Sequence, residues 1–131
     1  MKKDIEIPEV NNVFIAAVRE QHEEYKTMDW NTYIINDTNE ALEVVLIVSK
    51  GYDSKDATAI MRHTIKVLPA KSYAKIEFLQ EDVLKLNNEF AVTYFVGSKM
   101  HEKTFLFRAK SIKESKLREL PIIPKLGILA E

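Results

Sequence analysis

Residues 30–50, WNTYIINDTNEALEVVLIVSK, contain two strand-like runs separated by a polar turn. The first run, Trp30–Ile35, is rich in aromatic and β-branched residues, which favour pleated structure. Four turn-forming residues follow at Asn36–Asn39. In the second run, Leu42–Val48, the residues at both odd and even positions are apolar except for Glu43. This pattern is typical of a central strand covered on both faces. The stretch therefore predicts a hairpin whose second strand lies in the middle of a layered sheet.

Further strand patterns occur on both sides of this stretch. Ser72–Leu79 alternates most clearly: we expect Ala74, Ile76 and Phe78 on one face, and Tyr73, Lys75 and Glu77 on the other. We also predict strands at Val13–Glu20, Ile60–Leu68, Phe90–Val96 and Met100–Arg108. The last two of these are expected to pair as a hairpin. The remaining elements are an edge strand or extended lead-in at Lys2–Val10, one helical turn or a crossover at Gln80–Leu86 and a short helix at Lys110–Leu117.

This pattern is typical of a β-sandwich, in which about seven short strands alternate with turn signals every 8–12 residues. We therefore predict an all-β fold forming one domain, residues 1–131, with an extended C-terminal tail over residues 118–131. The segment Leu86–Val92 and the turns at Ile35–Asn39 and Leu68–Ser72 resemble those of immunoglobulin-like, fibronectin-type sandwiches. Phe90 stands where such domains often carry a tyrosine, so we expect no tyrosine corner here.

The composition is globular and nearly balanced in charge. The chain is 46% hydrophobic and 30% charged, and its 19 basic and 20 acidic residues leave a net charge of −1. Global attraction to nucleic acid or anionic lipid does not follow from that balance. The lack of cysteine excludes disulfides and thiolate chemistry. Because the sequence shows neither a secretory signal nor an apolar run of membrane-spanning length, we predict a cytoplasmic protein without membrane contact.

A narrower resemblance covers most of the chain. MKKDIEIPEV, SKGYDSKDATAIMRHTIKVLPAKSYAKIEF and LPIIPKLGILAE resemble a small family of uncharacterised bacterial proteins, some of them labelled phenylalanyl-tRNA synthetase alpha subunit. That resemblance implies an accessory role in tRNA charging. The aminoacyl-adenylate site of a synthetase needs arginines that contact the ATP phosphates. The residues themselves indicate no such site, because the arginines are scattered along the chain at Arg19, Arg62, Arg108 and Arg118.

Motifs for catalysis, cofactors or metals are not evident in the sequence. The three glycines are too far apart for a phosphate loop or a nucleophile elbow. His63 and His101 fall on predicted strands that folding could bring together, although no third metal ligand lies nearby in the sequence. The loop Asp53–Asp56 lacks the ligand density of a calcium site. We predict no catalytic, cofactor-binding or metal-binding residues, and an enzymatic role is not favoured.

The terminal LPIIPKLGIL is the stretch most suggestive of function. It either docks on the domain's own sheet or adds as a strand to the sheet of another chain. In the second case the protein would bind a protein partner, or form a homo-oligomer, through an edge strand or the tail. Nucleic acid is not an expected partner. The candidate partner-binding residues are Tyr52, Asp53, Pro121, Ile122, Ile123, Pro124 and Leu126. A non-enzymatic interaction or structural module is the favoured function; a tRNA-charging accessory protein or a small enzyme is the alternative.

Overall fold

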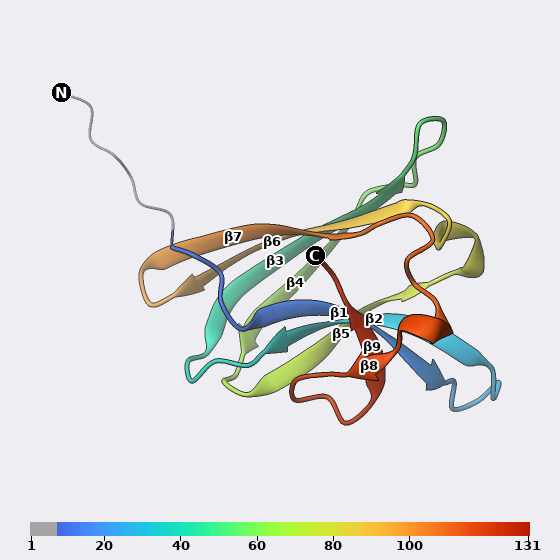
Figure 1. Cartoon of the computed structure of the whole chain (residues 1–131). Coiled ribbons are helices and arrows are strands. Elements are labelled where there is room, and N and C mark those ends of the chain that lie inside the picture. The colour runs from blue at the N-terminus through green and yellow to red at the C-terminus, as the bar shows by residue number, and fades with distance from the viewer. Residues whose placement is uncertain (1–7) are drawn as a thin grey trace.

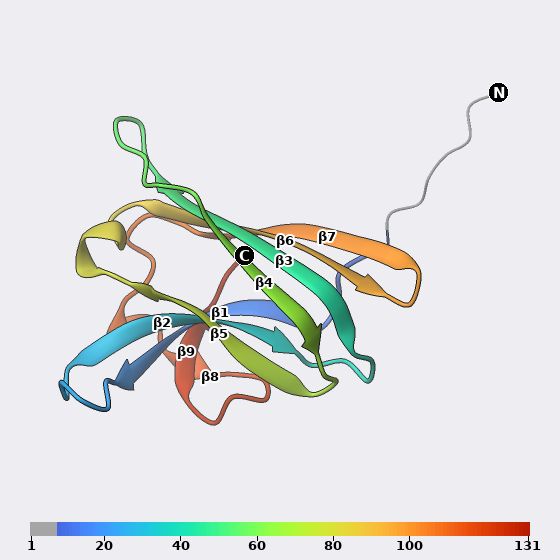
Figure 2. The same ribbon diagram turned by 180° about the vertical axis from the view of Figure 1, so that it is seen from behind.

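The structure, a computed structural model, describes residues 8–131 and consists of two antiparallel β-sheets packed face to face (Figure 1 and Figure 2). Sheet 1 has the order β5-β2-β1-β9-β8, with bounds Ser72–Leu79, Met28–Asn36, Val13–Gln21, Leu126–Leu129 and Arg118–Glu119. Sheet 2 has the order β4-β3-β6-β7, with bounds Met61–Leu68, Leu42–Tyr52, Asn87–Val96 and Lys99–Phe107. Of the predicted lead-in, residues 2–7 lie outside the described residues, and residues 8–10 have no regular structure.

The prediction of an all-β sandwich is confirmed. The first seven strands divide into β1, β2 and β5 against β4, β3, β6 and β7, and β9 and β8 extend the first of these sheets. The core between the sheets is apolar and includes the fully buried side chains Ile15, Ile34, Val45, Ile47, Phe90, Phe105 and Phe107. Among residues 8–131 there is no helix long and apolar enough to cross a membrane.

The prediction that β2 and β3 form a hairpin is wrong. β2 pairs with β1 and β5, whereas β3 pairs with β4 and β6, so the turn between them crosses from one sheet to the other. Asn36, which is fully buried, holds this crossing. Its Nδ2 lies 2.9 Å from the carbonyl oxygens of Glu40 and Pro69, and its Oδ1 accepts from the Thr38 hydroxyl. The turn residues were recognisable in the sequence, but not the sheet that each strand joins.

The expectation that Leu42–Val48 is covered on both faces is also wrong. β3 is an interior strand of its sheet, yet Val44 and Leu46 are 59% and 39% exposed. A β-bulge explains why both odd and even positions are apolar. The register with β6 shifts between Glu43 and Leu46, and Val44 has a φ of 50°. The bulge lets Leu42 and Val45 both face the core although they are of opposite parity.

A second bulge reverses the predicted faces in the second half of β5, whereas Ala74 and Ile76 pack against the core and Tyr73 and Lys75 are exposed, as predicted. Thr32 pairs with Glu77 and Tyr33 pairs with Lys75, which leaves Ile76 as the extra residue. After this point the parity changes, so that Phe78 is 49% exposed and Leu79 is buried. Glu77 consequently turns away from the outer face and points into the space between the sheets.

Two of the predicted local features are confirmed and one is not. The helical turn in Gln80–Leu86 is the 3-10 turn η1, Glu81–Val83. The β6–β7 hairpin forms around Gly97, whose φ is 61°. The short helix expected over Lys110–Leu117 is wrong: only the 3-10 turn η2, Glu114–Lys116, is present.

Asn88 takes over the place of the missing tyrosine corner. Its Nδ2 donates to the carbonyl oxygens of Val83 (2.9 Å) and Leu86 (3.1 Å), which satisfies the backbone where the chain enters β6. Phe90 is buried and packs edge-on against Phe107, with ring centroids 6.0 Å apart.

The C-terminal segment seals one side of the sandwich. β9 pairs with β1 next to Gly127, where a Cβ atom would lie 2.6 Å from the Ala17 carbonyl oxygen, so only glycine permits this approach. The last residues then cross to sheet 2, because the backbones of Glu131 and Leu106 exchange two hydrogen bonds. The tail therefore docks on the domain's own sheets, which was one of its two expected roles.

The loop between β8 and β9 also covers part of the outer face of sheet 1. Ile123 is buried in a small second core, together with Leu120 from the same loop and the strand residues Ala16, Val18 and Ile35. Ile122, one residue away, is 37% exposed. The two isoleucines thus have the same chemistry but very different environments.

We expect Ile123→Ala to lower the free energy of unfolding by about 2–4 kcal/mol, because it removes buried methyl groups and leaves a cavity over β1. Ile122→Ala is the matched control and should change it by less than about 1 kcal/mol. Urea unfolding followed by tryptophan fluorescence measures both. Equal effects of the two substitutions would contradict the sealing role of Ile123.

Candidate functional site

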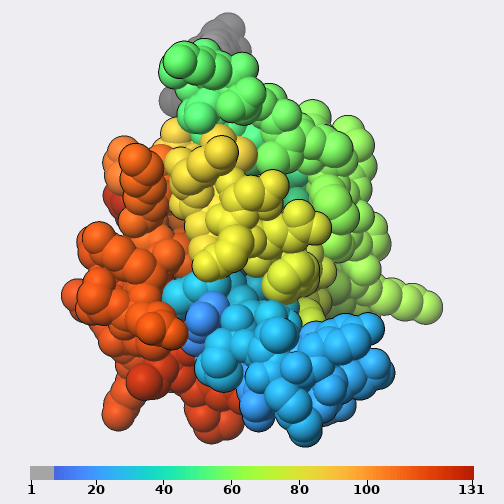
Figure 3. All heavy atoms as spheres, turned by 90° about the vertical axis from the view of Figure 1, so that its right-hand side faces the viewer, coloured from blue at the N-terminus to red at the C-terminus, as the bar shows by residue number. Residues whose placement is uncertain are grey.

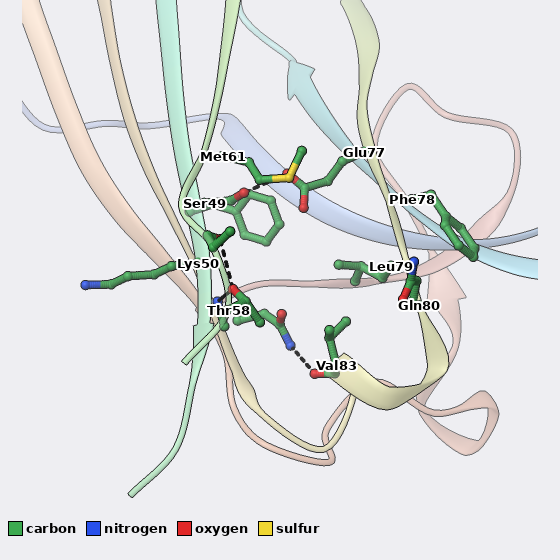
Figure 4. A pocket seen from close by; sticks show the side chains of 13 residues that line it. Ser49, Lys50, Thr58, Met61, Glu77, Phe78, Leu79, Gln80 and Val83 are labelled. Carbon is green, nitrogen blue, oxygen red and sulfur yellow. Dashed lines mark hydrogen bonds between the residues drawn. The ribbon is translucent and has the colours of Figure 1, made fainter. Parts of the chain in front are cut away.

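The side of the sandwich formed by β4 and β5 is open, in contrast to the side closed by the tail. Among the described residues no strand pairs with the outer edge of either β4 or β5. Where the two strands diverge, a cleft of about 200 Å³ lies between the sheets (Figure 4). Figure 3 shows this end of the molecule, with the segment that contains η1 (yellow) between the loop after β3 (green) and the loop after β1 (blue).

The cleft is lined by both apolar and polar residues. Its apolar lining comes from both sheets, from η1 and from the loop before β4, namely Ala59, Met61, Phe78, Leu79, Val83 and Phe90. The polar residues around it are Ser49, Lys50, Thr58, Glu77, Gln80 and Asn88. Met61 and Phe78 are 47% and 49% exposed, so two large apolar side chains border the opening and remain in contact with water. Such a rim is typical of a binding surface.

Glu77 joins the two sheets beside the cleft. The Ser49 hydroxyl donates to Glu77 Oε1 over 2.7 Å, and His63 Nε2 lies 2.8 Å from the same oxygen. The three residues come from β3, β4 and β5, and they converge because the β5 bulge turns Glu77 inward. Ser49 is buried, and the side chains of Glu77 and His63 are mostly covered.

A serine, a histidine and a carboxylate suggest a hydrolase, but their order here is different. A nucleophilic serine needs the histidine within hydrogen-bond distance, with the carboxylate behind the histidine. Here Glu77 stands in the middle, and both partners contact one of its oxygens. The histidine therefore contacts the carboxylate and not Ser49, and the arrangement connects strands of the two sheets.

A second polar cluster fastens the tail to the outer face of sheet 1. The Glu20 carboxylate accepts from Tyr33 Oη (2.6 Å), Asn31 Nδ2 (2.8 Å) and Lys125 Nζ (2.5 Å). Burial raises the pKa of Glu20, but the hydrogen bonds from Lys125, Tyr33 and Asn31 together outweigh it, and the net pKa lies below the ordinary value. Burial and the Glu20 carboxylate raise the pKa of Tyr33. The cluster fixes Lys125 and hence the loop before β9.

The sequence-predicted partner residues Tyr52 and Asp53 lie at the far end of β3. Tyr52 is half-buried, and its hydroxyl lies 3.5 Å from Glu89 Oε1. Asp53 Oδ1 accepts from the backbone N–H groups of Asp56 and Lys55, and these bonds lower the pKa of this fully exposed carboxyl. Asp53 therefore shapes its own loop.

The other predicted residues lie in the tail, and the structure does not bring them next to Tyr52 and Asp53 (Figure 1). Ile123 is buried, Pro121 is half-buried, and Pro124 and Leu126 are exposed. Ile122 has a φ of 63° and is exposed at the bend of the loop. Their role as a partner site stays a prediction, but Ile123 is already occupied within the chain.

The two strand histidines are not brought together. His63 is on β4 and His101 is on β7, the opposite edges of sheet 2. His101 instead stacks on Tyr94, with centroids 5.0 Å apart. Within residues 8–131 no group of three or more histidine, aspartate or glutamate side chains is placed to hold a metal ion.

Sequence reasoning missed the residues of the open side. Phe78 was expected in the core and Glu77 on the outer face, because the bulge at Ile76 has no glycine or proline to mark it. One signal was available. Residues 61–79 contain Arg62, Lys66, Lys71 and Lys75 but only one acidic residue, Glu77, although the whole chain has a net charge of −1.

Comparisons with known proteins assign no family. No protein-family model matches the chain, and no curated protein sequence is significantly similar to it. The resemblance to the synthetase-labelled proteins therefore stays a prediction, and the implied role in tRNA charging rests on that resemblance alone.

We expect Glu77→Ala to lower the free energy of unfolding by about 1–3 kcal/mol, because the buried Ser49 hydroxyl loses its acceptor. Glu102→Ala, on exposed β7, is the control and should change stability by less than about 0.5 kcal/mol. Chemical unfolding at neutral pH measures both. An unchanged stability for Glu77→Ala would contradict the connecting role of this carboxylate.

Glu20 predicts a specific dependence of stability on pH. Its folded pKa lies below the ordinary 4.5, so its contribution is present above that value and is lost as the pH falls through the folded pKa. We expect Glu20→Gln to be less stable than the wild type at pH 7, with the difference shrinking steadily below pH 4.5. Urea titrations at several pH values measure this, with the exposed Glu24→Gln as control. A difference that is independent of pH would contradict the assignment.

Proposed function

We propose that the protein is a non-enzymatic interaction module that binds a protein partner through the open β4–β5 side. The observation that carries this proposal is the asymmetry of the sandwich. On one side β9 and the β8–β9 loop cover β1 and Glu131 pairs with Leu106 of the edge strand β7, whereas the other side has two edge strands beside a cleft with Met61 and Phe78 at its opening.

Two physical arguments support a binding role for this side. Exposed edges invite pairing with another chain unless they are covered, bulged or charged; β5 is interrupted by its bulge at Ile76, which leaves the Met61–Ile65 part of β4 as the edge for a partner. In addition, large apolar side chains next to a cleft favour contact with a partner because their burial releases water. The geometry of Ser49, Glu77 and His63 supports a connecting role rather than a catalytic one.

Site-specific photocrosslinking in the cells that make the protein tests the proposal. A photoreactive phenylalanine analogue is introduced in place of Met61, and separately in place of Met100 on β7. These two methionines are almost equally exposed, at 47% and 48%, so they form a matched pair.

We expect the analogue at position 61, but not at position 100, to form one discrete protein adduct, because only the first borders the proposed site. Mass spectrometry identifies the adduct, and the purified partner is then titrated against wild-type protein. The proposal fails if position 61 gives no adduct, or if both positions give the same set of adducts.

A further inference from the structure

We propose that the occupant of the open side is an extended acidic segment that adds to sheet 2 as a strand along β4 and inserts one apolar side chain into the cleft. This inference rests on the proposed function and adds the chemistry of the partner. Three features carry it: the charge of the two edge strands, the uninterrupted pairing of Met61–Ile65 in β4 and the position of the cleft at the first residue of β4.

The β4–β5 side is positively charged. Residues 61–79 contain the cations Arg62, Lys66, Lys71 and Lys75 and the single carboxylate Glu77, which His63 and Ser49 occupy. Lys71 pairs with Asp37, but Arg62, Lys66 and Lys75 take part in none of the ion pairs among residues 8–131. The acidic residues Glu43 and Asp37 flank the far end of β4, and Glu81 and Asp82 lie beyond the cleft. Along the edge itself, the charge favours an acidic partner.

β4 is a better template than β5. Over Met61–Ile65, next to the cleft, β4 pairs with β3 residue for residue, and the ladder skips Lys66, which lies opposite Val44. β5, by contrast, is interrupted by its own bulge at Ile76. An added strand needs a continuous row of backbone donors and acceptors, which a bulge breaks.

The side-chain parity of β4 separates charge from apolar contact. Arg62 and Lys66 are four residues apart and both exposed, so they lie on the outer face of sheet 2. Met61 has the opposite parity and borders the cleft. A strand paired with β4 would therefore place acidic side chains of one face opposite Arg62 and Lys66. An apolar side chain on its other face would point towards Met61.

The cleft fits a single large apolar side chain. Its volume of about 200 Å³ lies between Met61 on one sheet and Leu79 and Val83 on the other side (Figure 4). An antiparallel strand on β4 runs from Leu68 towards Met61, so the apolar residue would be at its carboxyl end. A second copy of this chain is disfavoured as occupant, because pairing two β4 edges would bring Arg62 and Lys66 of both copies together.

The test uses the full chain and a fluorescein-labelled ten-residue peptide in which glutamates alternate with valines and a leucine lies near the carboxyl end. Fluorescence anisotropy at low salt gives the dissociation constant, and hydrogen exchange reports protection of the β4 amides. Two control peptides carry lysine in place of glutamate or glycine in place of leucine. A single-stranded oligonucleotide of the same charge tests general attraction to polyanions.

We expect Arg62→Glu combined with Lys66→Glu to weaken binding of the glutamate peptide by about tenfold or more and to create binding of the lysine peptide. Lys99→Glu with Lys103→Glu, the same pair of charges four residues apart on β7, is the matched control and should change the dissociation constant by less than about twofold. Ala59→Trp, which fills the cleft from an exposed position, should weaken binding about as much as the loss of leucine.

The inference is overturned if the charge reversals on β4 and β7 have equal effects, if β4 gains no protection, if the oligonucleotide binds with the same dependence on Arg62 and Lys66, or if sedimentation shows a dimer that these reversals dissolve. Should position 61 still form its discrete adduct in cells, only the chemistry of the occupant is wrong. If the peptide does not bind as expected and position 61 also forms no discrete adduct, the proposed function fails as well.

Discussion

The edges of its sheets are the constraint on which this structure depends. An edge strand carries backbone N–H and C=O groups that must be paired, covered or left to bind another chain. On one side, backbone hydrogen bonds from β9 and Glu131 satisfy β1 and part of β7. On the other side, the contacts of Glu77 with Ser49 and His63 connect the sheets between the β4–β5 turn and the cleft. β9 thus occupies the edge of β1, whereas among the described residues no strand occupies the outer edges of β4 and β5.

Two β-bulges give the second side its chemistry. The bulge at Ile76 turns one carboxylate inward and one phenylalanine outward, so the same backbone irregularity makes the connection between the sheets and the apolar rim of the cleft. The bulge at Val44 leaves Val44 and Leu46 on the outer face of sheet 2, close to the cations of β4. Bulges commonly redirect side chains in this way next to binding sites. The positive φ of a β-branched residue at Val44 costs conformational energy that the surrounding ladder must offset.

The fold class could be predicted from the sequence because strand periodicity and turn residues are local signals. Pro69 after β4, the glycine of the β6–β7 hairpin and the alternation in β5 each depend on a few neighbouring residues. Neither the crossing at Asn36–Asn39 nor the bulges could be predicted, because a turn between sheets and a turn within a sheet use the same residues. The candidate site depends on those features. Its positive charge was visible in the composition of residues 61–79, but its cleft was not.

The position of β9 beside β1 has a consequence for how the chain folds. The ion pair that fastens the tail joins Lys125 to Glu20, which are 105 residues apart, whereas β6 and β7 pair through a tight turn. Contacts across such a long loop have a large entropic cost of closure and form late. The hairpins of sheet 2 are therefore expected to assemble while β1 is still without its neighbour. During that interval the molecule has a second unsealed side, and chaperones or self-association would compete for it before the tail docks.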